Sequence, residues 1–252
     1  MKKPKKVFFF AYRKIGLKFY NYFSKLSKYE THLLAIHRND ANLFKNVKHN
    51  KLLFNKKDLN KCWDSIYKEL KKNDIDTCIL AWWPFIVPKK IVKLKNLRII
   101  NFHPSFLPYG RGKDSNFWSI VNQSPYGVSI MKINSNIDEG DYYIRKKIEY
   151  DILDTGETLY KKSQNQIFII YKKNIEKILE NKLTLKKQVL ENGTYNKRSD
   201  MLNITRIRLN KSYKAIDLIN ILRAKNFKGH ESCYFRYKNK NYEINLKIRE
   251  KK

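Results

Sequence analysis

The sequence predicts an α/β fold, with a mostly parallel β-sheet flanked by helices and a small C-terminal module. Two observations lead to this prediction. Short apolar runs typical of buried strands alternate with segments whose apolar residues recur at helical spacing. This alternation favours βαβ units, because parallel strands need crossover connections that are usually helices. In addition, 42% of the 252 residues are hydrophobic and 14% are aromatic, which is enough for an extended buried core.

The elements of the sheet follow one another along residues 7–183. Strands are expected at the apolar runs Val7–Tyr12, Thr31–Ile36, Asp76–Trp82, Leu97–Phe102 and Gly127–Ile133, and at the alternating segment Asp141–Tyr150. Helices are expected at Ile15–Leu26, Leu59–Leu70, Pro88–Leu94, Asn116–Val121 and Thr155–Leu183. Pro88 suits a first helical turn, because the amide proton that it lacks would have no intrahelical partner there. Thr155 and Thr158 are candidate caps for the longest helix.

The residues that follow the long helix are expected to form a smaller part of the chain. Thr184–Asn203 is polar and rich in Lys, and we predict a linker or irregular arm there. Beyond it we expect a short helix and a hairpin that turns at Asn239-Lys240, with elements at Ile216–Arg223, Cys233–Tyr237 and Tyr242–Ile248. The sequence therefore predicts two domains, comprising residues 1–183 and residues 184–252.

The formal net charge of +31 is typical of proteins that bind nucleic acid or anionic membranes. However, the cations are 43 Lys and 11 Arg, and Arg is the residue favoured for bidentate recognition of phosphates and bases. We therefore interpret most of the charge as a Lys-rich surface that suits anionic small substrates. No run of about 18 apolar residues predicts a membrane-spanning helix, so we expect a cytoplasmic protein. Cys62, Cys78 and Cys233 do not have the spacing of zinc ligands, so we expect no metal.

Residues suited to catalysis follow two of the predicted strands. One strand ends at Trp82-Trp83-Pro84, and another ends at Asn101-Phe102-His103-Pro104 and leads into a loop rich in Pro and Gly. Ligands of open parallel sheets bind beyond the carboxyl ends of the strands, so these two ends are candidate sites. The first strand-to-helix turn, Tyr12–Gly16, lacks the Gly-x-Gly-x-x-Gly pattern of dinucleotide-binding proteins. A dinucleotide cofactor is therefore not expected.

A further polar segment, Asn136–Asp141, lies about 35 residues beyond His103. A His can act as a base, an Asn can donate to a developing oxyanion, and an Asp can orient the His; acyl transfer needs these three groups. A single His in a loop, or a single Asp in a turn, is more often an ordinary structural residue. The combination is what points to a catalytic site.

The motifs Asn-x-His-Pro-Ser-x-Leu-Pro, Arg-Gly, Gly-Val-Ser-Ile-Met and Ile-Asp-Glu-Gly-Asp resemble the signature of the formyltransferases that use N10-formyltetrahydrofolate. The resemblance runs from about Asp76 to Asp141 and is weaker elsewhere. It implies a Rossmann-like formyltransferase fold, N-formyltransferase activity, and N10-formyltetrahydrofolate as the co-substrate. By position, Asn101, His103 and Asp138 match the family's catalytic Asn, His and Asp. The N-terminal domain, residues 1–183, would then be the catalytic domain.

The resemblance also suggests binding residues. The pterin end of the folate is expected near the Asp138 loop and along the main chain at Trp83, Phe85, Ile86 and Val87. The segment Leu107–Lys113 and the tail Leu222–Phe227 are similar to the branch that formylates amino sugars on nucleoside diphosphates. This similarity implies that Tyr109 and Lys113 lie near the sugar or its diphosphate. It also implies that residues 184–252 help to form a homodimer.

Three functions remain open from the sequence. The first is formylation of a nucleotide-linked amino-dideoxysugar, such as dTDP-4-amino-4,6-dideoxyglucose or a 3-amino analogue, for a bacterial surface polysaccharide such as the O-antigen of lipopolysaccharide. The second is a methionyl-tRNA formyltransferase-like activity, which suits the charge but for which the roughly 65 residues beyond the long helix are few. The third is a basic nucleic-acid-binding protein with a relic site, against which the complete Asn101, His103 and Asp138 set argues. We expect no membrane partner and no nucleic-acid partner.

Overall fold

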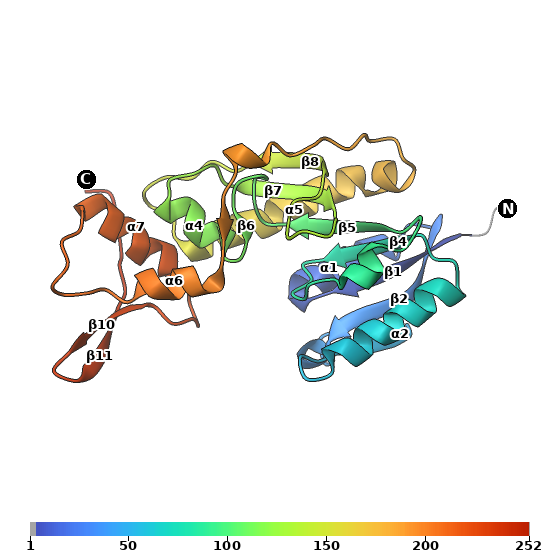
Figure 1. Ribbon diagram of the computed structural model, residues 1–252, viewed down its shortest axis with the longest axis horizontal. Helices are drawn as coiled ribbons and strands as arrows, with labels where there is room; N and C mark the ends of the chain where they lie inside the picture. The colour runs from blue at the N-terminus through green and yellow to red at the C-terminus, as the bar shows by residue number, and fades with distance from the viewer. Residues whose placement is uncertain (1–3, 252) are drawn as a thin grey trace. The chain divides into compact units, whose positions relative to one another are not determined.

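The computed structural model describes residues 4–251, which divide into two compact units (Figure 1). Unit 1 comprises the residues up to His103 together with Ile130–Asn136 and Asn174–Leu185. Unit 2 comprises Pro104–Ser129, Ile137–Lys173 and the residues from Lys186 onward. Within residues 4–251, no helix combines the length and the apolar character needed to cross a membrane.

The two units are built from the following elements. Unit 1 holds β1 (Lys5–Ala11), α1 (Arg13–Phe23), β2 (Tyr29–His37), the 3₁₀ turn η1 (Arg38–Asp40), β3 (Lys51–Phe54), α2 (Leu59–Lys72), β4 (Thr77–Ala81), α3 (Lys89–Val92) and β5 (Arg98–His103). Unit 2 holds β6 (Arg111–Gly112), α4 (Ser115–Val121), β8 (Tyr142–Lys147), η2 (Leu190–Asn192), β9 (Tyr195–Asn196), α6 (Arg198–Thr205), α7 (Ala215–Lys225), β10 (Cys233–Tyr237) and β11 (Lys240–Ile244). β7 (Gly127–Lys132) and α5 (Gly156–Leu179) contribute residues to both units.

The predicted α/β fold is confirmed by a seven-stranded sheet in the order β3-β2-β1-β4-β5-β7-β8. The pairings β1–β2, β1–β4, β2–β3 and β4–β5 are all parallel. Two-stranded sheets are formed by β10 with β11 and by β6 with β9. The antiparallel pair β10–β11 provides the hairpin that the sequence predicts near the end of the chain.

Successive Phe residues of β1 show why helices cover both faces of the sheet in unit 1. Neighbouring side chains of a strand point to opposite faces. Phe10 packs against Trp63 of α2, with ring centroids 5.6 Å apart, whereas Phe9 packs against Tyr20 and Phe23 of α1 at 5.5 and 5.3 Å. Because both faces need apolar side chains, the strand is a continuous hydrophobic run rather than an alternating one.

The start of α5 is fixed by hydrogen bonds within unit 2. The predicted caps are confirmed: the Thr155 N–H donates to Thr158 Oγ1 at 2.8 Å, and the Thr158 N–H donates to Thr155 Oγ1 at 3.3 Å. The buried Arg223 of α7 donates to the carbonyl oxygens of Asp151 and Asp154 at 2.8 and 2.7 Å, which joins α7 to the segment before α5. The bond from the Thr158 N–H pairs a main-chain donor that the start of a helix leaves without an intrahelical partner.

The structure differs from the sequence prediction in the segment Thr184–Asn203. We predicted a linker or irregular arm, but the segment includes β9, which pairs with β6, and the start of α6. The prediction fails because these two short elements are held by partners distant in the sequence, and hydrophobic periodicity does not report such contacts.

Two other differences concern strands. β3 was not predicted, because its four residues are too few to show a period. The hairpin turns at Lys238-Asn239, one residue earlier than predicted, and both residues have positive φ values of 42° and 62°. The second hairpin strand ends at Ile244 rather than at Ile248.

The buried carboxylate of Asp154 gives unit 2 a stability that depends on pH. It accepts hydrogen bonds from Lys162 Nζ at 2.7 Å, Thr158 Oγ1 at 2.8 Å and the Asp151 N–H at 3.0 Å. Burial by itself raises the pKa of Asp154, but the hydrogen bonds outweigh it and hold the pKa below its usual value. The resulting stability is fully present above the unfolded-state pKa of about 3.9 and is lost as the pH falls through the lower folded-state pKa.

We expect Asp154→Asn to lower the free energy of unfolding at pH 7 by about 2 kcal/mol, because it removes acceptors from charged and neutral donors. Urea denaturation at pH 7 and near pH 3 measures this, and the difference from the wild type should shrink at the lower pH. Asp217→Asn, at an exposed position of α7, is the matched control and should change little. An Asp154→Asn deficit that is the same at both pH values would contradict the linkage.

Candidate active site

Asn101 and His103 occupy the carboxyl end of β5, as predicted. Asn101 is half-buried and lies beside Leu80 of β4, and His103 is 7% exposed. Between them Phe102 is buried and packs against Phe19 of α1, with ring centroids 4.9 Å apart. Strand pairing and this core contact therefore hold the main chain of both polar residues in place.

Asp138 lies in the loop between β7 and β8, in unit 2. Its carboxylate Oδ2 accepts a hydrogen bond from the Gly112 N–H at 2.9 Å. Its backbone has φ 55°, in the left-handed region that Asp tolerates better than most residues. The next residue, Glu139, forms an ion pair with Arg111 at 2.9 Å. The Asp138 loop is thus joined to β6, which comprises Arg111 and Gly112.

Serine hydroxyls support the loop after β5 within unit 2. Ser115 Oγ donates to the Pro104 carbonyl oxygen at 2.6 Å. Ser129 Oγ donates to the Ser105 carbonyl oxygen at 2.8 Å and accepts from the Leu107 N–H at 3.2 Å. Because this loop carries the predicted substrate residues, its fixed main chain gives them a defined position.

The predicted substrate residues Tyr109 and Lys113 have different surroundings. Tyr109 lines a cavity of about 440 Å³ together with three cationic side chains, Arg145, Lys147 and Lys187. The Lys113 side chain is exposed, and its N–H donates to the Asn196 carbonyl oxygen at 3.1 Å. The cavity at Tyr109 suits an anionic group, and contact of either residue with a substrate stays a prediction.

The segment predicted to face the folate follows β4 in unit 1. Trp83 packs in the core against Phe10 and Phe54, with ring centroids 5.2 and 4.9 Å apart. Val87 is buried in the same cluster, Phe85 stacks on His37 at 5.6 Å, and Ile86 is 67% exposed. The exposed Ile86 beside stacked rings forms an apolar surface, and contact of these residues with a folate stays a prediction. The Trp83 side chain, in contrast, contributes to the core.

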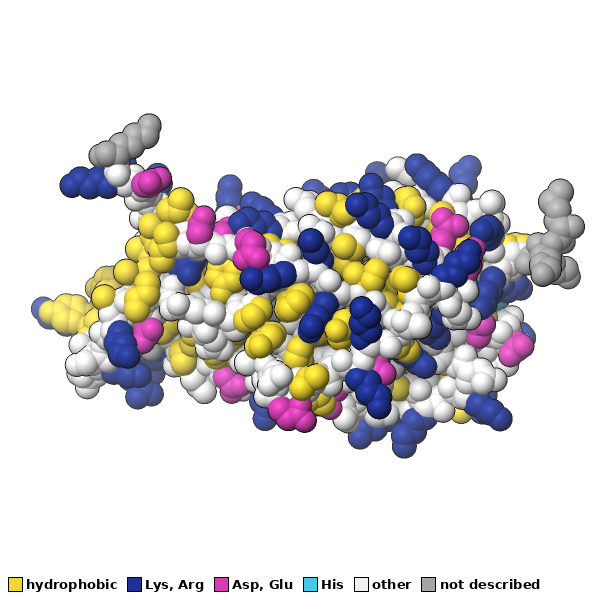
Figure 2. Space-filling model, turned by 90° about the horizontal axis from the view of Figure 1, so that it is seen from above, with side chains coloured by type: hydrophobic (Ala, Val, Ile, Leu, Met, Phe, Trp, Pro, Cys, Tyr) yellow, Lys and Arg dark blue, Asp and Glu magenta, His cyan; other side chains and the backbone are white. Residues whose placement is uncertain are grey.

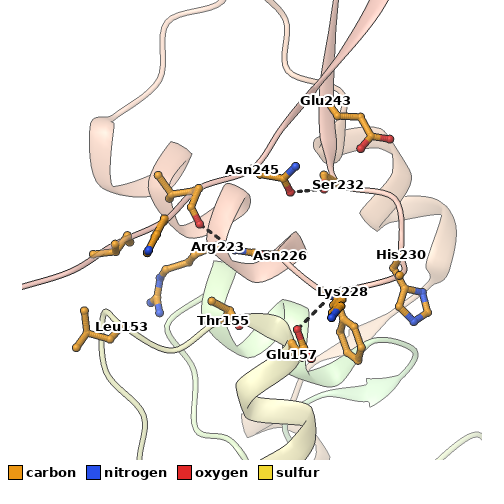
Figure 3. Close-up of a pocket in the computed structure, with 15 residues that line it drawn as sticks. Leu153, Thr155, Glu157, Arg223, Asn226, Lys228, His230, Ser232, Glu243 and Asn245 are labelled. Atoms are coloured by element: carbon orange, nitrogen blue, oxygen red, sulfur yellow. Dashed lines mark hydrogen bonds between the residues drawn. The ribbon is translucent and has the colours of Figure 1, made fainter.

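A larger cavity, of about 580 Å³, lies elsewhere in unit 2 and contains none of the predicted site residues (Figure 3). Some of its polar groups are paired within the protein. Glu157 accepts from the Lys228 N–H at 3.1 Å, and Ser232 Oγ donates to Asn245 Oδ1 at 2.8 Å.

The positive charge forms no single stripe on the face seen in Figure 2. Lys and Arg side chains are spread over that face among hydrophobic and uncharged ones. The positive side chains seen on this face are therefore dispersed among other residues.

Sequence reasoning missed two residues that contact Asp138. Gly112 was noted only as part of the Arg-Gly motif, and the structure shows that its N–H binds the Asp138 carboxylate. Gln188 donates to the Asp138 carbonyl oxygen at 2.9 Å, although it lies in the segment predicted as an irregular arm. No local pattern could identify Gln188, because its contact spans fifty residues of sequence.

Two family profiles match the chain. One, described as "Formyl transferase", matches residues 33–175, which is more than half of the chain. The other, described as "N-formyltransferase dimerization C-terminal domain", matches residues 200–250. The first profile includes every predicted catalytic and binding residue.

Individual relatives are similar at low identity. The methionyl-tRNA formyltransferase of Mycoplasma mycoides subsp. mycoides is 31% identical over 162 residues, which are 63% of this chain and 50% of that protein. The chain thus spans about half the length of the curated relatives it matches. A solved 4-N formyltransferase from Francisella tularensis has a TM-score of 0.81 at 24% identity, over 98% of both chains. An N-formyltransferase from Helicobacter canadensis, solved with folinic acid and dTDP-3-aminofucose, has a TM-score of 0.62 at 19% identity, over 94% of this chain and 85% of that one.

A side chain at position 112 should disrupt this site. A Cβ there would lie 2.3 Å from the Asn196 carbonyl oxygen, and φ is +89°. We expect Gly112→Ala to cost about 1–2 kcal/mol for the left-handed backbone and about 1–3 kcal/mol for the clash. Gly229→Ala is the matched control, because Gly229 has φ +79° but nothing within 4 Å of its Cβ position. Urea denaturation compares the two, and equal losses would contradict a close backbone approach at Gly112.

Proposed function

Because the chain belongs to the formyl transferase family, we propose that it transfers a formyl group from N10-formyltetrahydrofolate to the amine of a nucleoside-diphosphate-linked amino-dideoxysugar. The likeness to an N-formyltransferase solved with folinic acid and dTDP-3-aminofucose is the observation that carries this choice of acceptor. The likeness over 98% of both chains to a 4-N formyltransferase supports the same choice. The product would serve the synthesis of a bacterial surface polysaccharide such as the O-antigen, and the reaction would take place in the cytoplasm.

The folate supplies the formyl carbon as a co-substrate, and the residues of the chain manage charge and protons around it. Asn101 donates a hydrogen bond to the formyl oxygen as negative charge develops there. His103 accepts the proton that the attacking amine must lose, or stabilises the oxyanion as an imidazolium. Asp138 tunes His103 and relays protons. The exposed Ile86 and stacked Phe85 contact the pterin, and Tyr109 and Lys113 lie near the sugar or its diphosphate.

A panel of acceptors tests the proposal directly. The enzyme is incubated with formyltetrahydrofolate and either dTDP-4-amino-4,6-dideoxyglucose, a 3-amino analogue, a UDP-linked amino sugar or methionyl-tRNA, and mass spectrometry detects the gain of one formyl group. Formylation of a sugar nucleotide is the expected result. Formylation of methionyl-tRNA alone would refute the proposed acceptor.

His103→Ala is expected to lower kcat by about 100-fold or more, because it removes the proton acceptor. Asn101→Ala is expected to lower kcat by about 100- to 1,000-fold through loss of an oxyanion donor. Steady-state kinetics measures both, and circular dichroism checks that the variants are folded. His230→Ala, which alters an exposed histidine of unit 2, should keep full activity. Wild-type rates in either site variant would refute the assigned roles.

Formylation of methionyl-tRNA is the second candidate function. The 31% identity over 162 residues to a methionyl-tRNA formyltransferase favours it. The net charge of +31 also suits a tRNA substrate. The acceptor panel separates this candidate from the first.

We also propose that the C-terminal module, residues 184–252, forms a homodimer. The description of the matching domain supports this, and so do the exposed apolar side chains of the module, among them Leu209 at 60% and Tyr237 at 52% exposure. A second copy covering these side chains would remove apolar surface from water.

Light scattering after size exclusion is expected to give twice the mass of the chain. Tyr237→Glu should shift the protein towards the monomer, because it places a charge in the proposed interface. Ile169→Glu, at an exposed position of α5, is the matched control and should leave the dimer intact. A wild-type protein that stays monomeric at micromolar concentration would refute the proposed homodimer.

A further inference from the structure

We propose that Gln188 is a positioning residue for Asp138 in formyl transfer. It acts from a strap, which we define as residues Lys186–Asn196. The proposal rests on the proposed function, in which Asp138 tunes His103. Gln188 is not itself a catalytic residue, because its contacts in the structure are with main-chain atoms of the Asp138 loop.

The side-chain amide of Gln188 binds two carbonyl oxygens of that loop. Nε2 donates to the carbonyl oxygen of Asp138 at 2.9 Å and to that of Gly140 at 2.6 Å. Both partners are acceptors, so only the NH₂ end of the amide fits between them. Gln188 Oε1 is buried and has no hydrogen-bond partner within residues 4–251. The side chain therefore uses only its two N–H donors, and both bind carbonyl oxygens of the Asp138 loop.

The strap is anchored on both sides of Gln188. On one side, Lys186 and Tyr142 exchange two main-chain hydrogen bonds, at 3.0 and 2.9 Å. On the other side, the Arg111 N–H donates to the Thr194 carbonyl oxygen at 3.0 Å, and the Lys113 N–H donates to the Asn196 carbonyl oxygen at 3.1 Å. Gln188 therefore lies between two hydrogen-bonded parts of the strap. These bonds limit the movement of its side-chain amide.

The strap also fixes the carboxylate of Asp138 through Gly112. The pairing of Gly112 with Asn196 brings the Gly112 N–H to 2.9 Å from Asp138 Oδ2. Only a glycine allows this pairing, because a Cβ at position 112 would lie 2.3 Å from the Asn196 carbonyl oxygen. The strap therefore holds Asp138 at two points, its carbonyl oxygen through Gln188 and its carboxylate through Gly112.

This double hold explains how Asp138 keeps its backbone conformation. Asp138 has φ 55°, and a residue in that region persists there when the surrounding structure over-determines it. Without the Gln188 bonds, the main chain at Asp138 would be free to relax and to carry the carboxylate with it. A displacement of about 1 Å in a catalytic group can cost about 100-fold in rate.

The test compares Gln188→Met with Val189→Met. Methionine keeps the length of the Gln188 side chain but has no N–H donor. Val189→Met places the same residue at an exposed neighbouring position of the strap. Gln188→Glu is the second variant, which keeps the size and polarity of the side chain but turns an acceptor towards the two carbonyl oxygens. Each protein is measured for kcat and KM with the acceptor that the wild type formylates, and for hydrogen exchange of the backbone amides of residues 136–142.

We expect kcat to fall at least tenfold in Gln188→Met and Gln188→Glu, with KM for the acceptor within about twofold of the wild type. We expect the 136–142 amides to exchange at least tenfold faster in both variants and to be unchanged in Val189→Met. An unchanged kcat, or unchanged amide exchange in folded variants, would overturn the proposal. If the wild type formylates no sugar nucleotide, the proposed acceptor is wrong, and the same comparison with methionyl-tRNA and the same exchange measurement still decide the role of Gln188.

Discussion

The close approach of Gly112 to the strap is the constraint on which the candidate site in unit 2 depends. Its N–H binds the Asp138 carboxylate, and its pairing with Asn196 leaves no room for a Cβ. Buried main-chain groups must find partners, so three loops that meet at one point have to satisfy one another. Segments around residues 111, 138 and 195 therefore form one hydrogen-bonded network, although about 80 residues separate the first from the last.

Different contacts hold the predicted site residues on β5 and in the Asp138 loop. Strand pairing and core packing fix the main chain of Asn101 and His103 at the end of β5. Asp138 lies in a loop, which has no such support, and main-chain hydrogen bonds from Gly112 and the Gln188 amide replace it. The Asp138 loop is thus held by polar contacts, whereas β5 is held by strand pairing and apolar packing.

The net charge of +31 acts on the acidic side chains of the protein and on the field around it. With more than twice as many cations as carboxylates, an acidic side chain readily finds more than one Lys. Hydrogen bonds from Lys182 and Lys28 lower the pKa of Glu180 to about 2, for example. The surplus cations create a positive field, which would attract the anionic acceptor and folate that we propose.

The sequence by itself determined the α/β class, most strands and helices, the caps of α5, and the placement of Asn101 and His103 at the end of β5. These features follow from local periodicity, capping chemistry and the rule that ligands of parallel sheets bind at strand ends. It did not reveal β3, β9, α6 or the contacts of Gly112 and Gln188. Only the tertiary structure decided those, because each depends on hydrogen bonds or packing between residues far apart in the chain. A pattern within ten or twenty residues carries no record of such partners.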